Sequence, residues 1–217
     1  MNNFIVRNVI GLIGGVIFFA VYFYVPTIYF SLLLAFITGL IVLFEWNNIF
    51  KSNTALFWII LPVYPILPFI FLILLNQSLQ YRILLLFLFI IGFSFDIGSY
   101  YVGTLFGKHK LCPVISPGKT WEGFIGGCVF ATLTMLIFYY WQRLTGSLMP
   151  LFLVTLFLSI ILFLGDLFES MLKRRANIKD SGVLMPGHGG LLDRFDSILF
   201  ASYFVYLLRD CLLQLIY

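Results

Sequence analysis

Apolar stretches of about twenty residues recur from one end of this 217-residue chain to the other. About 20 apolar residues in a helix cross the ~30 Å hydrocarbon core of a bilayer, where the backbone must satisfy its own hydrogen bonds. Only 10% of the residues are charged, against about 25% in a soluble domain. We therefore predict an all-α fold, a polytopic transmembrane helical bundle of about seven spans. The expected spans are residues 4–25, 27–44, 55–75, 83–102, 121–141, 149–172 and 195–216.

Nothing outside these spans is long enough to form a separate soluble core. We divide the chain into N-terminal membrane spans (1–90) and a membrane region that carries both polar loops (91–217). No small-residue cleavage pattern follows the first apolar stretch, so we expect a retained span rather than a signal peptide. The net charge of +4 is not the basic stripe of a nucleic-acid binder.

Glycine and proline mark two local features of the N-terminal spans. Three glycines in the first span, Gly11, Gly14 and Gly15, would allow the close approach of a neighbouring helix. Three prolines in the third span, at positions 62, 65 and 68, predict a kink or break near its start.

The charged residues are concentrated in two segments. Of 22 Lys, Arg, Asp and Glu residues, five lie between Asp96 and Glu122 and ten lie between Asp166 and Asp196. The polar loops at 103–120 and 173–194 are separated by two membrane crossings, so both should emerge on the same face of the membrane. We therefore predict that the two loops meet in one polar site.

The end of the sixth span and the loop after it contain the densest polar pattern. Residues 166, 169, 170, 173 and 174 are spaced to form one stripe on a helix. An ion pair between Glu169 and Lys173 would be a purely structural explanation of part of this stripe. The loop then supplies four glycines and a proline, whose backbone amides can approach a phosphate closely. Asp193, Asp196 and Ser197 follow at the start of the last helix, where a carboxylate also suits the helix dipole.

Carboxylates, hydroxyls and cationic side chains together are typical of a site for Mg²⁺ and phosphate. Mg²⁺ prefers hard oxygen ligands, usually one or two carboxylates and substrate phosphates. Lysine and arginine offset the charge that develops on phosphoryl oxygens. Zinc does not fit, because His109 and His188 are the only histidines and neither has a second ligand at zinc spacing.

The pattern resembles the signature of the phosphatidate cytidylyltransferase (CDP-diacylglycerol synthase) family. The residues that carry the resemblance are Ser170-x2-Lys173-Arg174-x4-Lys179-Asp180-x-Gly182-x3-Pro186-Gly187-His188-Gly189-Gly190-x2-Asp193-Arg194-x-Asp196. A second block is similar to the family's other polar segment: Phe106-Gly107-Lys108-His109-Lys110-Leu111, followed by Ser116-Pro117-Gly118-Lys119-Thr120-Trp121-Glu122-Gly123. The resemblance covers residues 92–200 in detail.

The resemblance implies a Mg²⁺-dependent nucleotidyltransferase that converts CTP and phosphatidic acid to CDP-diacylglycerol and pyrophosphate. It implies Asp166 and Asp193 as metal ligands, with two divalent ions or one divalent and one monovalent ion both left open. The implied catalytic residues are Asp166, Lys173, Arg174, Lys179, Asp180, Asp193 and Asp196. The implied substrate-binding residues are Ser116, Lys119, Thr120, Glu122, Ser170, His188, Gly189 and Arg194. Thr120 would serve equally well as a helix cap, and His188 as a structural residue of the loop.

The implied substrates also suggest an orientation. CTP is cytosolic, so we expect an integral protein of the bacterial cytoplasmic membrane, in contact with membrane lipids, whose polar site faces the cytoplasm. The excess of Lys and Arg on that face agrees with the positive-inside rule, but most of these residues lie in the two motif loops. A homodimer is left open, as are a related CTP-dependent lipid enzyme of the CDP-archaeol synthase or polyprenol kinase type and an ion-coupled transporter.

Overall fold

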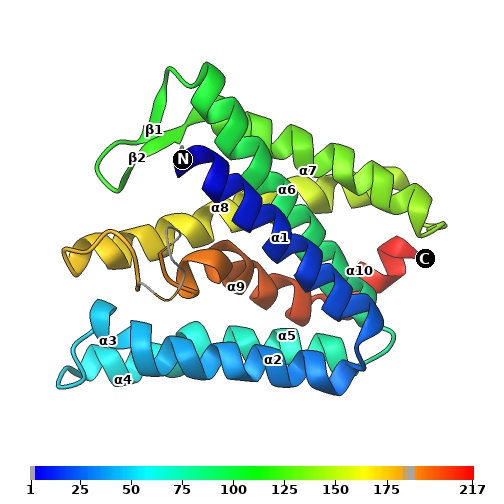
Figure 1. Ribbon diagram of the computed structural model, residues 1–217. Helices are drawn as coiled ribbons and strands as arrows, with labels where there is room; N and C mark the ends of the chain where they lie inside the picture. Colours follow the sequence, from blue (N-terminus) through cyan, green and yellow to red (C-terminus); the bar gives the residue numbers. More distant parts are fainter. Residues whose placement is uncertain (1–2, 183, 185–188) are drawn as a thin grey trace.

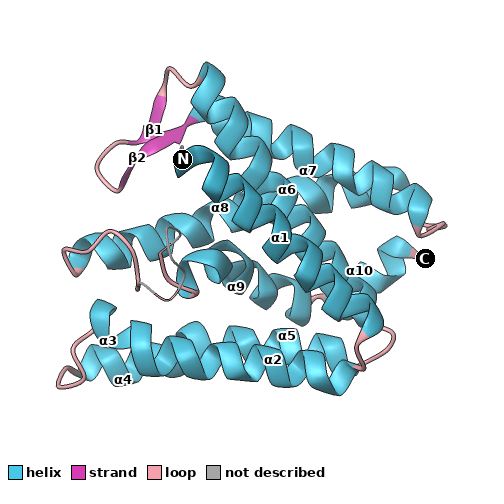
Figure 2. Ribbon diagram, viewed as in Figure 1, coloured by secondary structure: helices cyan, strands magenta, loops and turns pink. Residues whose placement is uncertain are grey.

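Helices make up almost all of the computed structural model, which describes residues 3–182, 184 and 189–217, with side chains from Gly14 onward. In lipid this is expected, because a helix satisfies its backbone hydrogen bonds within itself. The elements, shown in Figures 1 and 2, are α1 (Asn3–Tyr24), α2 (Thr27–Leu40), the π-helical turn η1 (Ile41–Glu45), α3 (Trp46–Ile49), α4 (Ala55–Leu61), η2 (Pro62–Ile66), α5 (Leu67–Gln77), α6 (Arg82–Phe106), β1 (Lys110–Cys112), β2 (Ser116–Thr120), α7 (Trp121–Trp141), α8 (Leu148–Arg175), α9 (Leu192–Leu207) and α10 (Arg209–Ile216).

Five helices of the described chain are long and apolar enough to cross a membrane. They are Thr27–Ile49, Ala55–Gln77, Arg82–Phe106, Trp121–Trp141 and Leu148–Arg175. A sixth crossing results if α9 and α10 together form one span, and the apolar part of α1 whose side chains are described, Gly14–Tyr24, is shorter. The prediction of a helical membrane protein is confirmed, and the count of seven spans stays a prediction.

The last predicted span is not a straight helix. α9 and α10 meet at an angle of 82°, and the two charges Arg209 and Asp210 follow the break at once. The guanidinium group of Arg209 lies 4.6 Å from the ring centroid of Tyr206, and the hydroxyl of Tyr81 donates to Asp210. The bend therefore gives both charges polar or aromatic partners. A straight helix would have carried the charges past these partners.

The third predicted span is broken where the prolines predicted it. Tyr64 has a non-helical backbone (φ −148°, ψ 113°) between α4 and α5. The hydroxyl of Tyr203 donates to the carbonyl oxygen of Val63 at 2.5 Å, which satisfies one backbone group that the break leaves without a helical partner.

Close helix packing depends on glycines other than the predicted ones. A Cβ at Gly14 or Gly15 would meet nothing within 4 Å, so no described helix of this chain uses the close approach that these two glycines allow, and Gly11 lies outside the described side chains. The close approach occurs between α6 and α7, where a Cβ at Gly98 would lie 2.7 Å from the carbonyl oxygen of Gly126. Gly126 in turn leaves room for the side chain of Val102.

Both polar segments lie at the same end of the bundle, as predicted. Figure 1 shows the β1–β2 hairpin and the loop between α8 and α9 at the end opposite α10. The segment before α7 was predicted to be a loop, but part of it forms this antiparallel hairpin, in which Lys110 pairs with Thr120 and Cys112 with Ser116. The guanidinium Nε of Arg174 donates to the carbonyl oxygen of Ile115 at 3.2 Å and so joins α8 to the hairpin.

We expect Gly126→Ala to destabilise the protein, because its new Cβ would overlap the side chain of Val102 in the α6–α7 contact. Overpacking of this kind costs about 1–3 kcal/mol. Gly39→Ala is the matched control, since a Cβ there meets nothing within 4 Å. Thermal denaturation in detergent should show a lower midpoint for Gly126→Ala alone, and equal midpoints would contradict this account of the packing.

Candidate functional site

The polar site is built around the last three turns of α8. As the stripe predicted, this part of the helix presents Asp166, Glu169, Ser170 and Lys173 to the interior or to the polar end of the bundle, whereas Arg174 is exposed. Glu169 is fully buried and Lys173 is 9% exposed. Such charges are stable near membrane depth only when they have polar partners.

Lys173 is the cation at the centre of this cluster. Its ammonium group lies 2.6 Å from Asp193 Oδ1 on α9 and 3.4 Å from Glu169 Oε1 on its own helix. The structural ion pair that the i,i+4 spacing allowed is therefore present, but the shorter contact of Lys173 links α8 to α9. Two buried anions share one buried cation.

Asp193 organises the loop before α9. Its carboxylate accepts the backbone N–H of Ser181 at 3.0 Å and that of Gly190 at 2.7 Å, in addition to the ammonium group of Lys173. Gly189 has φ +84°, and a Cβ there would lie 2.6 Å from Asp193 Oδ2. The predicted site residue Gly189 is thus needed for a left-handed turn pressed against Asp193.

Asp196 is the second carboxylate of α9 in this cluster. It is 9% exposed and accepts the N–H of Ser197 at 2.6 Å. Its charge interacts with those of Asp166 and Lys173. Gly165 lets α9 approach α8 here, because a Cβ at that position would lie 3.0 Å from the carbonyl oxygen of Asp196.

Lys119 joins the β1–β2 hairpin to α8. Its ammonium group lies 2.5 Å from Asp166 Oδ2 and 4.9 Å from the ring centroid of Phe163. The side chain of Asp166 is 35% exposed, and its other oxygen is 3.4 Å from the hydroxyl of Ser170. The two polar segments that the sequence predicted to meet are therefore joined by an ion pair.

Two other residues of the hairpin segment have structural contacts. Thr120 is buried, and its hydroxyl accepts the N–H of Gly123, so it caps α7. Glu122 accepts the backbone N–H groups of Lys108 and His109 and lies 2.6 Å from His109 Nδ1. These contacts fix the shape of the hairpin and leave Ser116, half-buried in β2, as the remaining predicted residue on this side.

The other predicted residues lie on the loop or at its edges. Lys179, Asp180 and Arg194 are exposed, and Asp180 lies against Gly189. His188 lies outside the described residues. Lys179 and Arg194 thus add exposed positive charge next to Asp180 and Asp193 in sequence, which would attract an anionic ligand.

The structure adds Glu45, which the sequence prediction missed. Glu45 ends the π-helical turn η1 and is fully buried, far from the motif segments in sequence. Its carboxylate accepts the N–H of Leu191 at 2.6 Å, the N–H of Leu192 at 2.8 Å and the hydroxyl of Ser181 at 3.0 Å. The free amides at a helix start attract an anion, and here Glu45 satisfies two of those of α9.

Glu45 also explains two glycines of the motif. A Cβ at Gly182 would lie 2.8 Å from Glu45 Cγ, and a Cβ at Gly190 would lie 2.6 Å from Glu45 Oε2. Asn48, one turn later, donates to the carbonyl oxygen of Ser181 at 2.8 Å. The one sequence signal was a lone acidic residue at the end of an apolar span, which is a candidate functional residue in a membrane protein.

Asp96 on α6 also lies outside the predicted set. It is exposed on its helix, and its charge interacts with those of Asp166, Asp196 and Lys119. Carboxylates from α6, α8 and α9 thus face the same region.

The donor chemistry of the cluster fits Mg²⁺, although the described residues contain no group of three or more His, Cys, Asp or Glu side chains already arranged as ligands. Asp166 has the most available carboxylate, because it is partly exposed and one of its oxygens has only a long contact with Ser170. The oxygens of Asp193 already accept two backbone amides and one ammonium group. The ammonium groups of Lys119 and Lys173 contact Asp166 and Asp193, at positions from which a metal ion would approach these carboxylates.

Comparison with known proteins gives one family and a set of bacterial relatives. Residues 4–212 match the cytidylyltransferase family. Proteins named phosphatidate cytidylyltransferase are similar to this chain: 52% identical over 119 residues in Bacillus subtilis (strain 168), 48% over 116 residues in Staphylococcus haemolyticus (strain JCSC1435) and 47% over 125 residues in Staphylococcus aureus (strain COL). The matches cover 55%, 54% and 58% of this chain and 44%, 45% and 47% of those relatives. The chain thus spans less than half the length of the relatives that it matches.

We expect Glu45→Gln to loosen the loop before α9, because an amide nitrogen replaces one of two accepting oxygens beside buried donors. Leaving a buried donor unsatisfied costs about 1–3 kcal/mol, so amide exchange at Leu191 and Leu192 should rise on the order of tenfold. Hydrogen–deuterium exchange measured on peptides from the loop checks this.

Two further variants complete the experiment. Gly190→Ala should have the same effect, because its Cβ would displace Glu45. Asp210→Asn, at the opposite end of the bundle, should leave exchange in the loop unchanged. Unchanged exchange in Glu45→Gln would show that Glu45 does not hold the loop.

Proposed function

This chain belongs to the cytidylyltransferase family, and we propose that it is a phosphatidate cytidylyltransferase of the bacterial cytoplasmic membrane. In the proposed reaction, a phosphate oxygen of phosphatidic acid bonds to the α-phosphorus of CTP. The bond from that phosphorus to the bridging oxygen of the β-phosphate breaks. CDP-diacylglycerol and pyrophosphate are the products.

The observation that supports this proposal most strongly is the Lys119–Asp166 ion pair. It joins the two polar segments into one cluster of carboxylates and cations at the end of a membrane bundle. The relatives named phosphatidate cytidylyltransferase are about half identical over the matched stretch. A lipid phosphate at the membrane surface and a nucleotide from the cytosol could both reach such a cluster, so we propose that this end faces the cytoplasm.

The chemistry required of the protein is mainly positioning and charge neutralisation. The attacking phosphate is already an anion near neutral pH, so no strong general base is needed. Lys119 and Lys173 would neutralise phosphate charge inside the cluster, and Arg174, Lys179 and Arg194 would do so at its exposed edge.

Asp193 would act by holding other groups in place. It fixes the ammonium group of Lys173 and two loop amides at once, so it sets the shape of the loop that faces the phosphates.

We propose Mg²⁺ as the cofactor, with Asp166 as its main carboxylate ligand and Asp193 as a second one. When bound, the ion would neutralise the departing pyrophosphate. Asp166 would ligate through Oδ1, which has only the long contact with Ser170, while Lys119 contacts the other oxygen. The carboxylates of Asp96 and Asp196 would raise the negative potential that attracts the cation.

Incubation with phosphatidic acid and CTP labelled at the α-phosphate tests the proposed function. Label in the lipid product identifies a cytidylyltransferase, whereas a CTP-dependent lipid kinase would leave the label in free CDP.

We expect Asp193→Asn to reduce the rate by about 10²-fold or more, the typical effect of losing a preorganised electrostatic contact. Asp210→Asn should keep the wild-type rate. No labelled lipid from the wild-type chain would overturn the proposed function.

Removal of divalent ions should abolish the reaction, and Mg²⁺ should restore it. Asp166→Asn should raise the Mg²⁺ concentration needed for half-maximal rate at least tenfold, because it removes a charged ligand. Lys119→Met, which frees the same carboxylate of its ammonium partner, should lower the rate without raising that concentration. An unchanged Mg²⁺ requirement in Asp166→Asn would exclude Asp166 as the ligand.

A further inference from the structure

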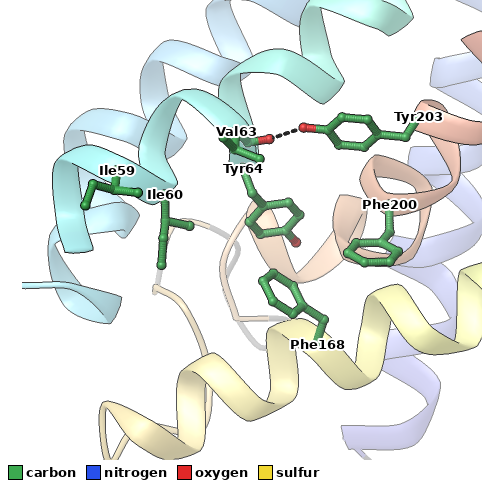
Figure 3. A pocket seen from close by; sticks show the side chains of 7 residues that line it. All are labelled: Ile59, Ile60, Val63, Tyr64, Phe168, Phe200 and Tyr203. Carbon is green, nitrogen blue, oxygen red and sulfur yellow. Dashed lines mark hydrogen bonds between the residues drawn. The ribbon is translucent and has the colours of Figure 1, made fainter. Parts of the chain in front are cut away.

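An apolar groove lies beside the polar cluster, between the α4–η2 segment and helices α8 and α9. Its volume is about 380 Å³, and the side chains that line it include Ile59, Val63, Tyr64, Phe168, Phe200 and Tyr203 (Figure 3). Every surface that these side chains present to the groove is apolar. No motif residue of the sequence analysis contributes to it.

The outer rim of the groove faces the bilayer. Ile59 and Val63 are 64% and 55% exposed, and both belong to the candidate span Ala55–Gln77. Phe168 on the other wall belongs to the candidate span Leu148–Arg175. A lipid chain can therefore enter the groove from the side, without passing through the polar cluster.

The inner end of the groove reaches the polar cluster. Phe168 lies on α8 between Asp166 and Glu169, and its ring packs edge-on against Tyr64, with 5.4 Å between the ring centroids. The apolar wall and the cluster are thus adjacent turns of one helix.

The hydroxyl of Tyr64 lacks a hydrogen-bond partner among the described residues, although Tyr64 is only 3% exposed. Buried hydroxyls are nearly always hydrogen-bonded, because an unsatisfied one loses its hydration without compensation. Figure 3 shows this hydroxyl pointing between Phe168 and Phe200 at the inner end of the groove. The hydroxyl does not form part of the groove surface, so the groove offers an acyl chain no polar group.

We propose that this groove holds one acyl chain of the diacyl phosphate lipid that the site consumes. This inference rests on the proposed function. A phosphate at the cluster and an acyl chain in the groove are joined in one molecule only in a lipid substrate, which selects this occupant over a helix of a second copy. Because bilayer lipid is as apolar as the groove, the groove contributes orientation and selectivity rather than a hydrophobic driving force.

Filling the groove tests this proposal through substrate selectivity. We expect Val63→Trp to raise the ratio of KM for dioleoyl to KM for dihexanoyl phosphatidic acid about tenfold, because only the long chain needs the filled space. Ile70→Trp is the matched control, since Ile70 is also exposed on the same span but does not line the groove, and its ratio should equal that of wild type. An unchanged ratio in Val63→Trp, or a change of its oligomeric state alone, would overturn the proposal.

A binding measurement separates this inference from the proposed function. Phosphatidic acid with a photoreactive diazirine on its acyl chain should label residues of the groove in the wild-type protein and at least fivefold less in Val63→Trp. Equal labelling by a diazirine phosphatidylcholine would show a general lipid contact and overturn the groove assignment. If labelling is selective but no CDP-lipid forms, the groove stands and the proposed reaction fails.

Discussion

The ion pair between Lys173 and Asp193 is the contact on which the polar end of the molecule depends. It joins α8 to α9, and the same carboxylate accepts the loop amides of Ser181 and Gly190. Removing Lys173 would leave Asp193 and Glu169 without their shared cation where water is scarce, and breaking a buried pair in this way costs several kcal/mol. The ion pair therefore stabilises the fold locally and orders the residues that the proposed chemistry requires.

Around this contact, carboxylates and cations alternate rather than separate into two patches. Lys119 pairs with Asp166, and Lys173 lies between Glu169 and Asp193. In this arrangement the two lysines and their carboxylate partners neutralise one another. Under the proposed function, a polyphosphate with its metal ion would exchange partners with this cluster: the phosphates would contact the lysines and the metal would bind the carboxylates.

Much of this arrangement could be predicted from local patterns, and the rest could not for physical reasons. Span positions follow from hydropathy, and the meeting of the polar segments follows from the parity of crossings. The buried partner Glu45 could not be predicted, because its contacts join residues 136 to 147 positions apart, which no local pattern records. The hairpin and the cap formed by Thr120 depend on pairing across short polar segments, where turn and ligand-binding residues have the same composition. Gly14 and Gly15 show that small residues permit close packing without requiring a neighbour.

The distance in sequence between Glu45 and its partners has a consequence for biogenesis. Glu45 enters the membrane region at the end of the second predicted span, when Ser181, Leu191 and Leu192 have not yet been synthesised. Until they arrive, its carboxylate lacks the hydroxyl and the two N–H groups that donate to it in the finished protein. The packing of η1 against the polar loop can therefore be completed only after α9 has been synthesised.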